Sequence, residues 1–510
     1  MVRQVGVAVL KRASEWVKNA ARLPGRVAQL QSVFFPSPTD QPDDRHETGR
    51  SPLLERLDGL SDQANRLLDL ADRGAESAWW AEFFSEVGAV NSAALMRRGA
   101  KPSLPYRVVF LVHHIGAWAS IAPVIDVMRA DPDFEVTVIS IPANFRGQAI
   151  HGDDLISAEL DRMGVAHLRL PYPNVHMSTR VIVGLQPDLI FRQSQWEDDV
   201  LSAFRSPALD FTRLALIPYT LVNMLCSPPG GVDSAFDSLL HRSAWRVYLP
   251  DQRALANDAE AAGADRSSHV ITGHPKIEFL RRAEPTWPLP GPAKHRVLWS
   301  AHHSVDTGWV NFGLFPKTAP LMIGWARRHP DCQVVLMLHP LTRQVLADPD
   351  RSPIAPAKAD QLFRQWDELA NTAVYEGADY GGLFKSSDAM ITDGISMLAE
   401  YQIASKPLIF TERADHRPFN DIGEMLMTGV HRHHDPLAAL ADLDACLAAG
   451  VDDQADEHAA NIMSLSTFAD AAERIAADVK AGLAAEAAAP ADQPLRPPAV
   501  RARPAVAARS

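Results

Sequence analysis

Histidines, hydroxyls and glycines follow four strand-like apolar runs in the second half of the sequence. Histidines stand at the ends of three of these runs, and a Thr-Asp-Gly-Ile-Ser turn ends the fourth. Because the carboxyl ends of parallel strands meet at one edge of a sheet, these side chains should gather at one site. The residues concerned are Gly273, His274, His302, His303, His339, Thr392, Asp393, Gly394 and Ser396.

The turn from Thr392 to Ser396 has the composition of a phosphate-binding turn. A helix that begins after such a turn presents unpaired N–H groups and the positive end of its dipole. Gly394 lets a ligand approach the backbone, and the Ser396 hydroxyl can bond a phosphate oxygen or cap its own helix. Histidines beside the turn can bond phosphoryl oxygens or neutralise their charge when protonated. The sequence therefore predicts a phosphate site, although it lacks the GxxxxGK[ST] pattern of a Walker-type loop.

Apolar runs of strand length alternate with helix-length segments from Tyr106 to Phe410. Such alternation is typical of parallel sheets covered by helices on both faces. One series of strands ends before Pro250, and a second begins near Ser268 with the run HVITGHP. We therefore predict an α/β protein with two doubly wound, Rossmann-like domains that face each other across a cleft. Ligands in such sheets bind beyond the carboxyl ends of the strands.

The two ends of the chain differ in composition from this α/β region. Residues 1–100 predict a basic amphipathic and helical extension with a Pro-rich linker, and residues 481–510, rich in Ala, Pro and Arg, predict a disordered tail. Residues 105–265 and 266–480 are the predicted first and second α/β domains. The first thirty-five residues carry six basic side chains against one acid. This segment fits an amphipathic helix on an anionic membrane, and it fits a solvated arm equally well.

Composition limits the class of protein further. The chain has 510 residues, a net charge of −12 and three widely separated cysteines. The length predicts more than one domain, and the negative charge argues against a nucleic-acid partner. No apolar run has the length of a transmembrane helix, and the cysteine spacing suggests reduced thiols. We therefore expect a cytoplasmic protein, with a peripheral position on the inner face of the cell membrane as the alternative.

The segment SDAMITDGISMLAEYQIASKPLIF, residues 387–410, resembles the signature of the CDP-glycerol glycerophosphotransferase family, which includes the teichoic-acid polymerases. The segments TGHPKIEF (272–279), LWSAHHSV (298–305) and LHP (338–340) are similar to other motifs of that family. The resemblance implies a GT-B-like fold that binds the nucleotide mainly in its second domain. It implies CDP-glycerol or a related CDP-alditol as donor, a hydroxyl of a cell-envelope or capsule glycan as acceptor, and CMP as leaving group.

Two departures from the family pattern bear on the catalytic residues. The polymerases carry a Trp-His-Gly motif whose histidine looks like the general base, whereas the comparable stretch here, LALIPYTLVNM (214–224), has no histidine. Ile395 stands where the first of two serines would be. His113 and His114, which follow the first strand, are the substitute bases, with simple packing in the strand-end loop as the alternative.

The candidate site residues fall into two groups. The catalytic candidates are His113, His114, His303 and His339. The donor-binding candidates are His302, His339, Asp393, Gly394, Ser396, Thr392, Gly273 and His274, with Asp393, Gly394, Ser396 and His339 assigned to the pyrophosphate by the resemblance.

The remaining expectations concern metals, partners and alternatives. No cofactor and no metal requirement is predicted, and HRHHDP (431–436) is expected to be a solvated loop. Arg192 and Gln193 are expected to contact the acceptor, which is a glycan or a lipid-linked glycan. Two other functions stay open: a GT-B glycosyltransferase that uses a nucleotide-sugar, and a catalytically weakened relative that only binds nucleotide or glycan.

Overall fold

A computed structural model describes residue 97 and residues 100–144, 152–171, 175–227, 238–254, 267–305, 310–377, 379–466 and 468–489. The predicted N-terminal extension and the segment after residue 489 lie outside this part. Contacts divide the chain into two units, one of residues 1–100 with 174–186 and one of residues 101–173 with 187–510. The described part of the first unit is mainly helix α7 (Val175–Gly184). Both sheets belong to the second unit.

The first domain is built on a seven-stranded sheet in which every strand pairs in parallel, in the order β3-β2-β1-β4-β5-β6-β7. The first strand in sequence, β1 (Tyr106–Val112), is almost entirely apolar and buried, as expected for a strand with helices on both faces. The strands are β1 (Tyr106–Val112), β2 (Phe134–Ser140), β3 (Leu168–Arg169), β4 (Leu189–Arg192), β5 (Arg213–Leu216), β6 (Arg246–Leu249) and β7 (His269–Ile271). Helices α5 (Ala122–Ala130), α6 (Asp154–Arg162), α8 (Leu239–Ser243) and α10 (Pro275–Arg282) accompany them.

The second domain is built on a six-stranded parallel sheet in the order β10-β9-β8-β11-β12-β13. An apolar cluster covers each face: on β8, Leu298 enters one cluster while Val297 and Trp299 enter the other. The strands are β8 (Arg296–Ala301), β9 (Gln333–Leu338), β10 (Thr372–Tyr375), β11 (Ala389–Thr392), β12 (Leu408–Thr411) and β13 (His431–His433). The helices are α11 (Phe315–Arg328), α12 (Pro340–Ala347), α13 (Pro356–Asp367), α14 (Gly381–Ser386), α15 (Ile395–Glu400), α16 (Asp421–Met427), α17 (Pro436–Ala449) and α18 (Ala455–Leu465).

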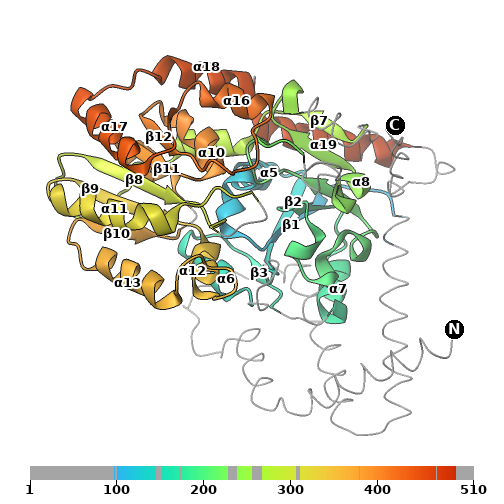
Figure 1. The fold of residues 1–510 in the computed structure, drawn as a ribbon. Helices are drawn as coiled ribbons and strands as arrows, with labels where there is room; N and C mark the ends of the chain where they lie inside the picture. Colours follow the sequence, from blue (N-terminus) through green and yellow to red (C-terminus); the bar gives the residue numbers. More distant parts are fainter. Residues whose placement is uncertain are drawn as a thin grey trace, which may run out of the picture. The chain divides into compact units, whose positions relative to one another are not determined.

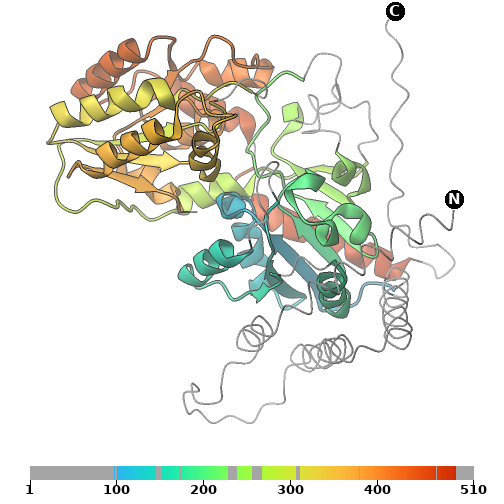
Figure 2. The ribbon, with the colours of Figure 1, turned by 60° about the horizontal axis from the view of Figure 1, so that its bottom comes forward.

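After the second sheet the chain returns to the first domain as helix α19 (Ala471–Ala488). Figures 1 and 2 both show this helix, in red, beside the elements of the first sheet. Ile475, Val479 and Leu483 are fully buried in the core cluster that contains β1 and α5. On the polar side, Asp478 accepts hydrogen bonds from Arg246 Nε (2.9 Å) and from the Tyr248 hydroxyl (3.0 Å). The first domain is therefore assembled from two separate parts of the sequence.

The doubly wound α/β prediction is confirmed by the strand orders. In the first sheet the chain begins at β1, moves outward through β2 and β3, and then crosses back to β4 beside β1. In the second sheet it begins at β8, moves outward through β9 and β10, and crosses back to β11 beside β8. The crevice at such a reversal is where open α/β sheets bind ligands. The segments after β1, β4, β8 and β11 are therefore the places to look for a site (Figure 1).

Three details of the prediction are wrong. The run HVITGHP was expected to open the second sheet, but β7 pairs with β6 in the first sheet. Residues 431–433 form the edge strand β13 instead of a solvated loop, and residues 481–488 are helical instead of part of a disordered tail. The predicted domain boundaries otherwise stay a prediction. None of the helices in the described part of the chain is both long and apolar enough to cross a membrane.

Candidate functional site

A side chain clamps the backbone at the reversal point of each sheet. In the first domain, Gln193 Oε1, just after β4, accepts hydrogen bonds from the N–H groups of His113 (2.9 Å) and His114 (3.0 Å). In the second domain, Asp393 follows β11, and its Oδ1 accepts a hydrogen bond from the N–H of His302 (2.5 Å). The two sheets thus fix the segments after their first strands, β1 and β8, in the same way. These segments carry the predicted histidines.

Four of the predicted histidines form one cluster, which we call the histidine cluster: His114, His302, His303 and His339. The ring of His303 stacks on that of His339, with centroids 4.2 Å apart, and on that of His302 at 4.5 Å. The His339 ring lies 6.4 Å from the ring of His114. His114 follows β1 of the first domain, whereas the other three follow β8 and β9 of the second. The cluster therefore joins the reversal points of both sheets.

Burial keeps these rings neutral. It lowers the pKa of His114 to about 4, with the positive charge of Lys276 as the second cause. Burial also lowers the pKa of His302 to about 3 and holds those of His303 and His339 well below 6.5, and repulsion between the rings adds to the effect. At pH 7 the cluster therefore consists of uncharged imidazoles, each able to donate or accept one proton.

The backbone sets which ring nitrogen carries the proton in two of these histidines. His339 is the N-cap of α12, and its Nδ1 accepts a hydrogen bond from the N–H of Leu341 (3.1 Å). His302 Nδ1 accepts in the same way from the N–H of Ser304 (3.2 Å). A neutral ring whose Nδ1 accepts must carry its proton on Nε2. Both rings therefore have Nε2–H donors, which suit the anionic oxygens of a phosphate.

The turn after β11 uses most of its polar groups internally. Thr392 Oγ1 accepts the N–H of Gly394 (2.8 Å), and Asp393 Oδ2 accepts the N–H of Leu314 (2.5 Å). Burial raises the pKa of Asp393 to about 7 even though its amide donors favour the carboxylate. Ser396 is exposed, and it does not cap the helix because Gly394 is the N-cap of α15. Of the predicted phosphate contacts in this turn, Ser396 is the one on the surface.

Gly273 and His274 hold the connection between the domains together. Gly273 has φ of +84°, and a Cβ there would lie 3.0 Å from the Phe468 carbonyl oxygen. His274 Nδ1 accepts the N–H of Lys276 (3.1 Å), and its Nε2–H donates to the Pro218 carbonyl (2.8 Å). Both ring nitrogens of His274 are thus occupied by protein groups. These contacts favour a positioning role for the two residues over contact with a donor.

Two further predicted residues are buried. His113 is 2% exposed. Arg192 is also buried, and its guanidinium donates to Glu197 Oε2 (2.9 Å) and to the Trp196 carbonyl (2.9 Å). The guanidinium nitrogens that we expected to contact the acceptor substrate are therefore bonded within the protein.

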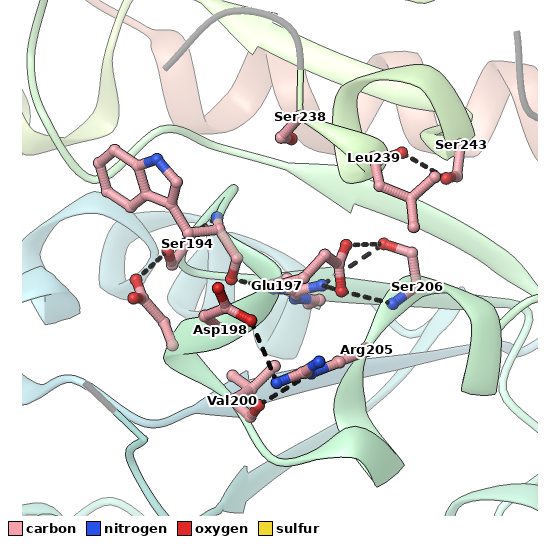
Figure 3. A network of polar contacts seen from close by, with 12 residues as sticks. Ser194, Glu197, Asp198, Val200, Arg205, Ser206, Ser238, Leu239 and Ser243 are labelled. Carbon is pink, nitrogen blue, oxygen red and sulfur yellow. Dashed lines mark hydrogen bonds and ion pairs between the residues drawn. The ribbon is translucent and has the colours of Figure 1, made fainter. Parts of the chain in front are cut away.

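The segments after β4 and β5 together build an aromatic wall beside His114. Figure 3 shows its polar network, in which Glu197 accepts from both the N–H (2.9 Å) and the hydroxyl (2.5 Å) of Ser206. Trp196 packs on Tyr219 with ring centroids 5.8 Å apart, and Tyr219 packs on His114 at 6.0 Å. Tyr219 belongs to the stretch without a histidine that we compared with the Trp-His-Gly motif. That stretch thus borders the cluster through a tyrosine.

Sequence reasoning missed a buried ion pair next to the cluster. Lys276 Nζ on α10 lies 2.8 Å from Glu400 Oε1 at the end of α15. The other oxygen of Glu400 accepts a hydrogen bond from the Tyr380 hydroxyl (2.5 Å). The only signals were the position of Lys276 after Gly-His-Pro and that of Glu400 inside the signature segment. Among the described residues, groups of three side chains close enough to share a metal ion lie elsewhere.

Comparisons with known proteins define the class of the fold. No family model matches the chain, and no curated protein sequence does. Solved structures do match: the fold is GT-B-like, as predicted. The wall teichoic acid polymerase TagF matches with a TM-score of 0.53 over 86% of this chain and 100% of its own, at 10% identity. A putative UDP-N-acetylglucosamine 2-epimerase from Listeria monocytogenes matches with a TM-score of 0.50 over 75% and 97%, at 16% identity. At such identities the likeness extends to the fold alone.

Proposed function

We propose that the protein transfers glycerophosphate, or a related alditol phosphate, from a CDP-activated donor to a hydroxyl of a cell-envelope or capsule glycan, with release of CMP. The observation that carries the proposal is the meeting of His114 from one domain with His303 and His339 from the other. The histidine cluster offers Nε2–H donors, which suit a pyrophosphate group. The resemblance of residues 387–410 to the glycerophosphotransferase signature and the fold shared with TagF support the same choice.

The roles of the cluster follow from its protonation. The Nε2–H groups of His302 and His339, together with the Ser396 hydroxyl, bind the non-bridging oxygens of the pyrophosphate. Because the Nδ1 atoms of His302 and His339 accept backbone N–H groups, both rings stay neutral and act through their Nε2–H groups. These N–H dipoles lie where negative charge develops on the departing phosphate, and phosphoryl transfer depends mainly on such stabilisation and on positioning.

His114 is the base in this proposal because it is neutral and lies on the first-domain side of the cluster. The acceptor oxygen attacks the phosphorus that carries the glycerol, and the hydroxyl proton passes to His114. The bond between that phosphorus and the bridging oxygen breaks, and CMP leaves with the bonding electrons. Tyr219 and Trp196 border the base and form the wall against which an acceptor sugar packs.

A nucleotide-sugar donor is the second candidate. The epimerase that shares the fold is named for a UDP-sugar. In addition, Ile395 removes one hydroxyl from the turn that resembles the signature of CDP-glycerol enzymes. Such a donor would leave a nucleoside diphosphate instead of CMP, so the two candidates differ in their released product.

Nucleotide release tests the proposal directly. The full chain is incubated with CDP-glycerol, CDP-ribitol or UDP-N-acetylglucosamine and an envelope extract as acceptor, and released nucleotides are quantified. We expect CMP with a CDP-alditol and a loss of about 100-fold or more in His114→Gln and His339→Gln. His295→Gln is the matched control, since His295 precedes β8 at the opposite end of the sheet.

Each other outcome has a definite meaning. UDP release selects the nucleotide-sugar candidate. Donor binding without any turnover selects a binding protein. CMP release that is unchanged in both cluster variants would contradict the assigned roles.

The proposal also includes a peripheral position on the inner face of the membrane through residues 1–35. Sedimentation with anionic vesicles, with and without those residues, tests that position.

A further inference from the structure

The edge strand β13 and the helix α17 bring four potential metal ligands together, away from the histidine cluster. His431 and His433 are two residues apart on β13, so their side chains point to the same face of the strand. Asp442 and Cys446 are four residues apart on α17 and share one face of the helix. We expected a solvated loop at residues 431–436 because neighbouring histidines cannot all reach one ion from a regular element. In the strand that forms instead, the alternate residues His431 and His433 share a face.

The ligand atoms of His431, Asp442 and Cys446 lie within 4.8 Å of one another, and His433 reaches this group through Asp442. Asp442 Oδ2 lies 2.7 Å from His433 Nε2 and 3.1 Å from His431 Nδ1. Cys446 Sγ lies 4.0 Å from His431 Nδ1 and 3.8 Å from Asp442 Oδ1. Bonds of about 2.0–2.3 Å to a tetrahedral Zn²⁺ place its ligand atoms about 3.3–3.6 Å apart. Small side-chain adjustments therefore bring the atoms of His431, Asp442 and Cys446 to coordination distance, and His433 beside Asp442 is the candidate for the fourth position.

The chemistry of the ligands favours zinc. A thiolate, imidazole nitrogens and one carboxylate are the ligand types that Zn²⁺ takes in proteins, whereas Mg²⁺ and Ca²⁺ prefer oxygen ligands alone. Cys446 is 8% exposed, and the side chain of His431 is 13% exposed. The ligands are thus sheltered enough for a closed structural site.

A second layer of residues already supports His431 as a ligand. Its Nε2 lies 3.4 Å from Asp452 Oδ1, which also accepts the N–H of Gln454 (3.1 Å). Histidines that bind a metal through one nitrogen usually donate the other N–H to such a carboxylate. The side chain of Asp452 is 1% exposed, and its Oδ2 lies 3.4 Å from His458 Nδ1. This buried carboxylate thus has a reason to be present if His431 holds a cation.

We propose that β13 and α17 hold a Zn²⁺ ion between His431, Asp442 and Cys446, with His433 as the fourth ligand. The thiol proton of Cys446 passes to solvent as the Zn–S bond forms. The ion fastens the edge strand to the helix that covers it. This inference does not depend on the proposed transferase function.

Metal content measured on the full chain tests the proposal. The protein is produced in zinc-supplemented medium, purified without chelators or metal-affinity resin, and analysed by inductively coupled plasma mass spectrometry. We expect about one Zn²⁺ per chain in the unmodified protein and in Cys226→Ser, whose thiol belongs to no metal-ligating group among the described residues. Cys446→Ser and His433→Gln should lose the ion, and Asp452→Asn should weaken its binding by about 10–100-fold.

Cobalt substitution keeps the test independent of whether a variant folds. Co²⁺ added to the metal-free unmodified protein should produce a thiolate-to-cobalt absorption band, and one equivalent of Zn²⁺ should remove it. Absence of both bound zinc and this band would overturn the proposal. Retention of zinc in Cys446→Ser with its loss in Cys332→Ser would do the same, because it would place the ion at the separate group of His329, Asp331 and Cys332.

Discussion

The buried ion pair between Lys276 and Glu400 predicts a non-additive pattern of stability. The two charged atoms are 2.8 Å apart, and the side chains are 3% and 1% exposed. At an effective dielectric constant of about 20, their attraction is about 6 kcal/mol, and the cost of desolvating both ions offsets much of it. Removing one partner leaves the other charge buried and unpaired. Lys276→Met and Glu400→Gln should therefore each lower the free energy of unfolding by about 3–5 kcal/mol.

A double-mutant cycle measured by urea denaturation tests this reasoning. The double variant contains neither charge, so its loss should be smaller than the sum of the two single losses by about 2 kcal/mol or more. The exposed pair of Arg474 and Asp470 is the control, and its two single losses should be additive because solvent screens the pair. Additive losses at Lys276 and Glu400 would refute the reasoning.

The same variants have a second readout at the histidine cluster. Burial is the main cause that lowers the pKa of His114 to about 4 and the charge of Lys276 is the second, so Lys276→Met should raise that pKa by the part due to the charge. Nuclear magnetic resonance of the imidazole protons follows this titration residue by residue. A pKa of His114 that stays in place would mean that burial alone accounts for the shift.

Three other predictions concern stability. Gly273→Ala should cost at least about 1–2 kcal/mol more than Gly291→Ala in urea denaturation, because both have positive φ but only Gly273 has neighbours within 4 Å of a Cβ. Since burial lowers the pKa of His114 from 6.5 to about 4, the unfolded chain binds a proton before the folded chain does as the pH falls, and the free energy of unfolding should decline between pH 6.5 and pH 4. His114→Gln should reduce the slope of this decline by up to about 1.4 kcal/mol per pH unit. Burial raises the pKa of Glu412, but hydrogen bonds from Arg432 and His416 outweigh it, so the net pKa is lowered. The stability that this carboxylate contributes is therefore present near pH 7 and lost in acid, and Glu412→Gln should remove that acid-sensitive part of the stability.

The sequence was sufficient to predict the strands and the residues that follow them where a local pattern determines the structure. Buried parallel strands are continuous apolar runs, so β8, β9 and β11 could be located together with the residues that follow them. The geometry of parallel sheets then placed His302, His303 and His339 at one edge. That His114 lies beside them depends on the packing of two domains, and the prediction of facing sheets anticipated it only in outline.

Other features depend on pairings between distant residues, which one sequence does not reveal. The pattern of β7 is the same whichever sheet it joins, so its position in the chain led to the wrong sheet. The run His431-Arg432-His433 has no apolar residue, and its strand conformation comes from pairing with β12. Lys276 and Glu400 are 124 residues apart in sequence, and no local signal joins them.

Because α19 follows the second sheet in the sequence, the first domain lacks part of its core while the second domain is being synthesised. About 200 residues separate β7 from α19, and at about 5–20 residues per second the ribosome needs about 10–40 s to make them. The strands between Arg296 and His433 can therefore form their sheet first, and the surface of α5 that later contacts Ile475 and Val479 stays exposed until then. The nascent first domain thus presents a temporary apolar surface to which a chaperone could bind, and α19 closes it.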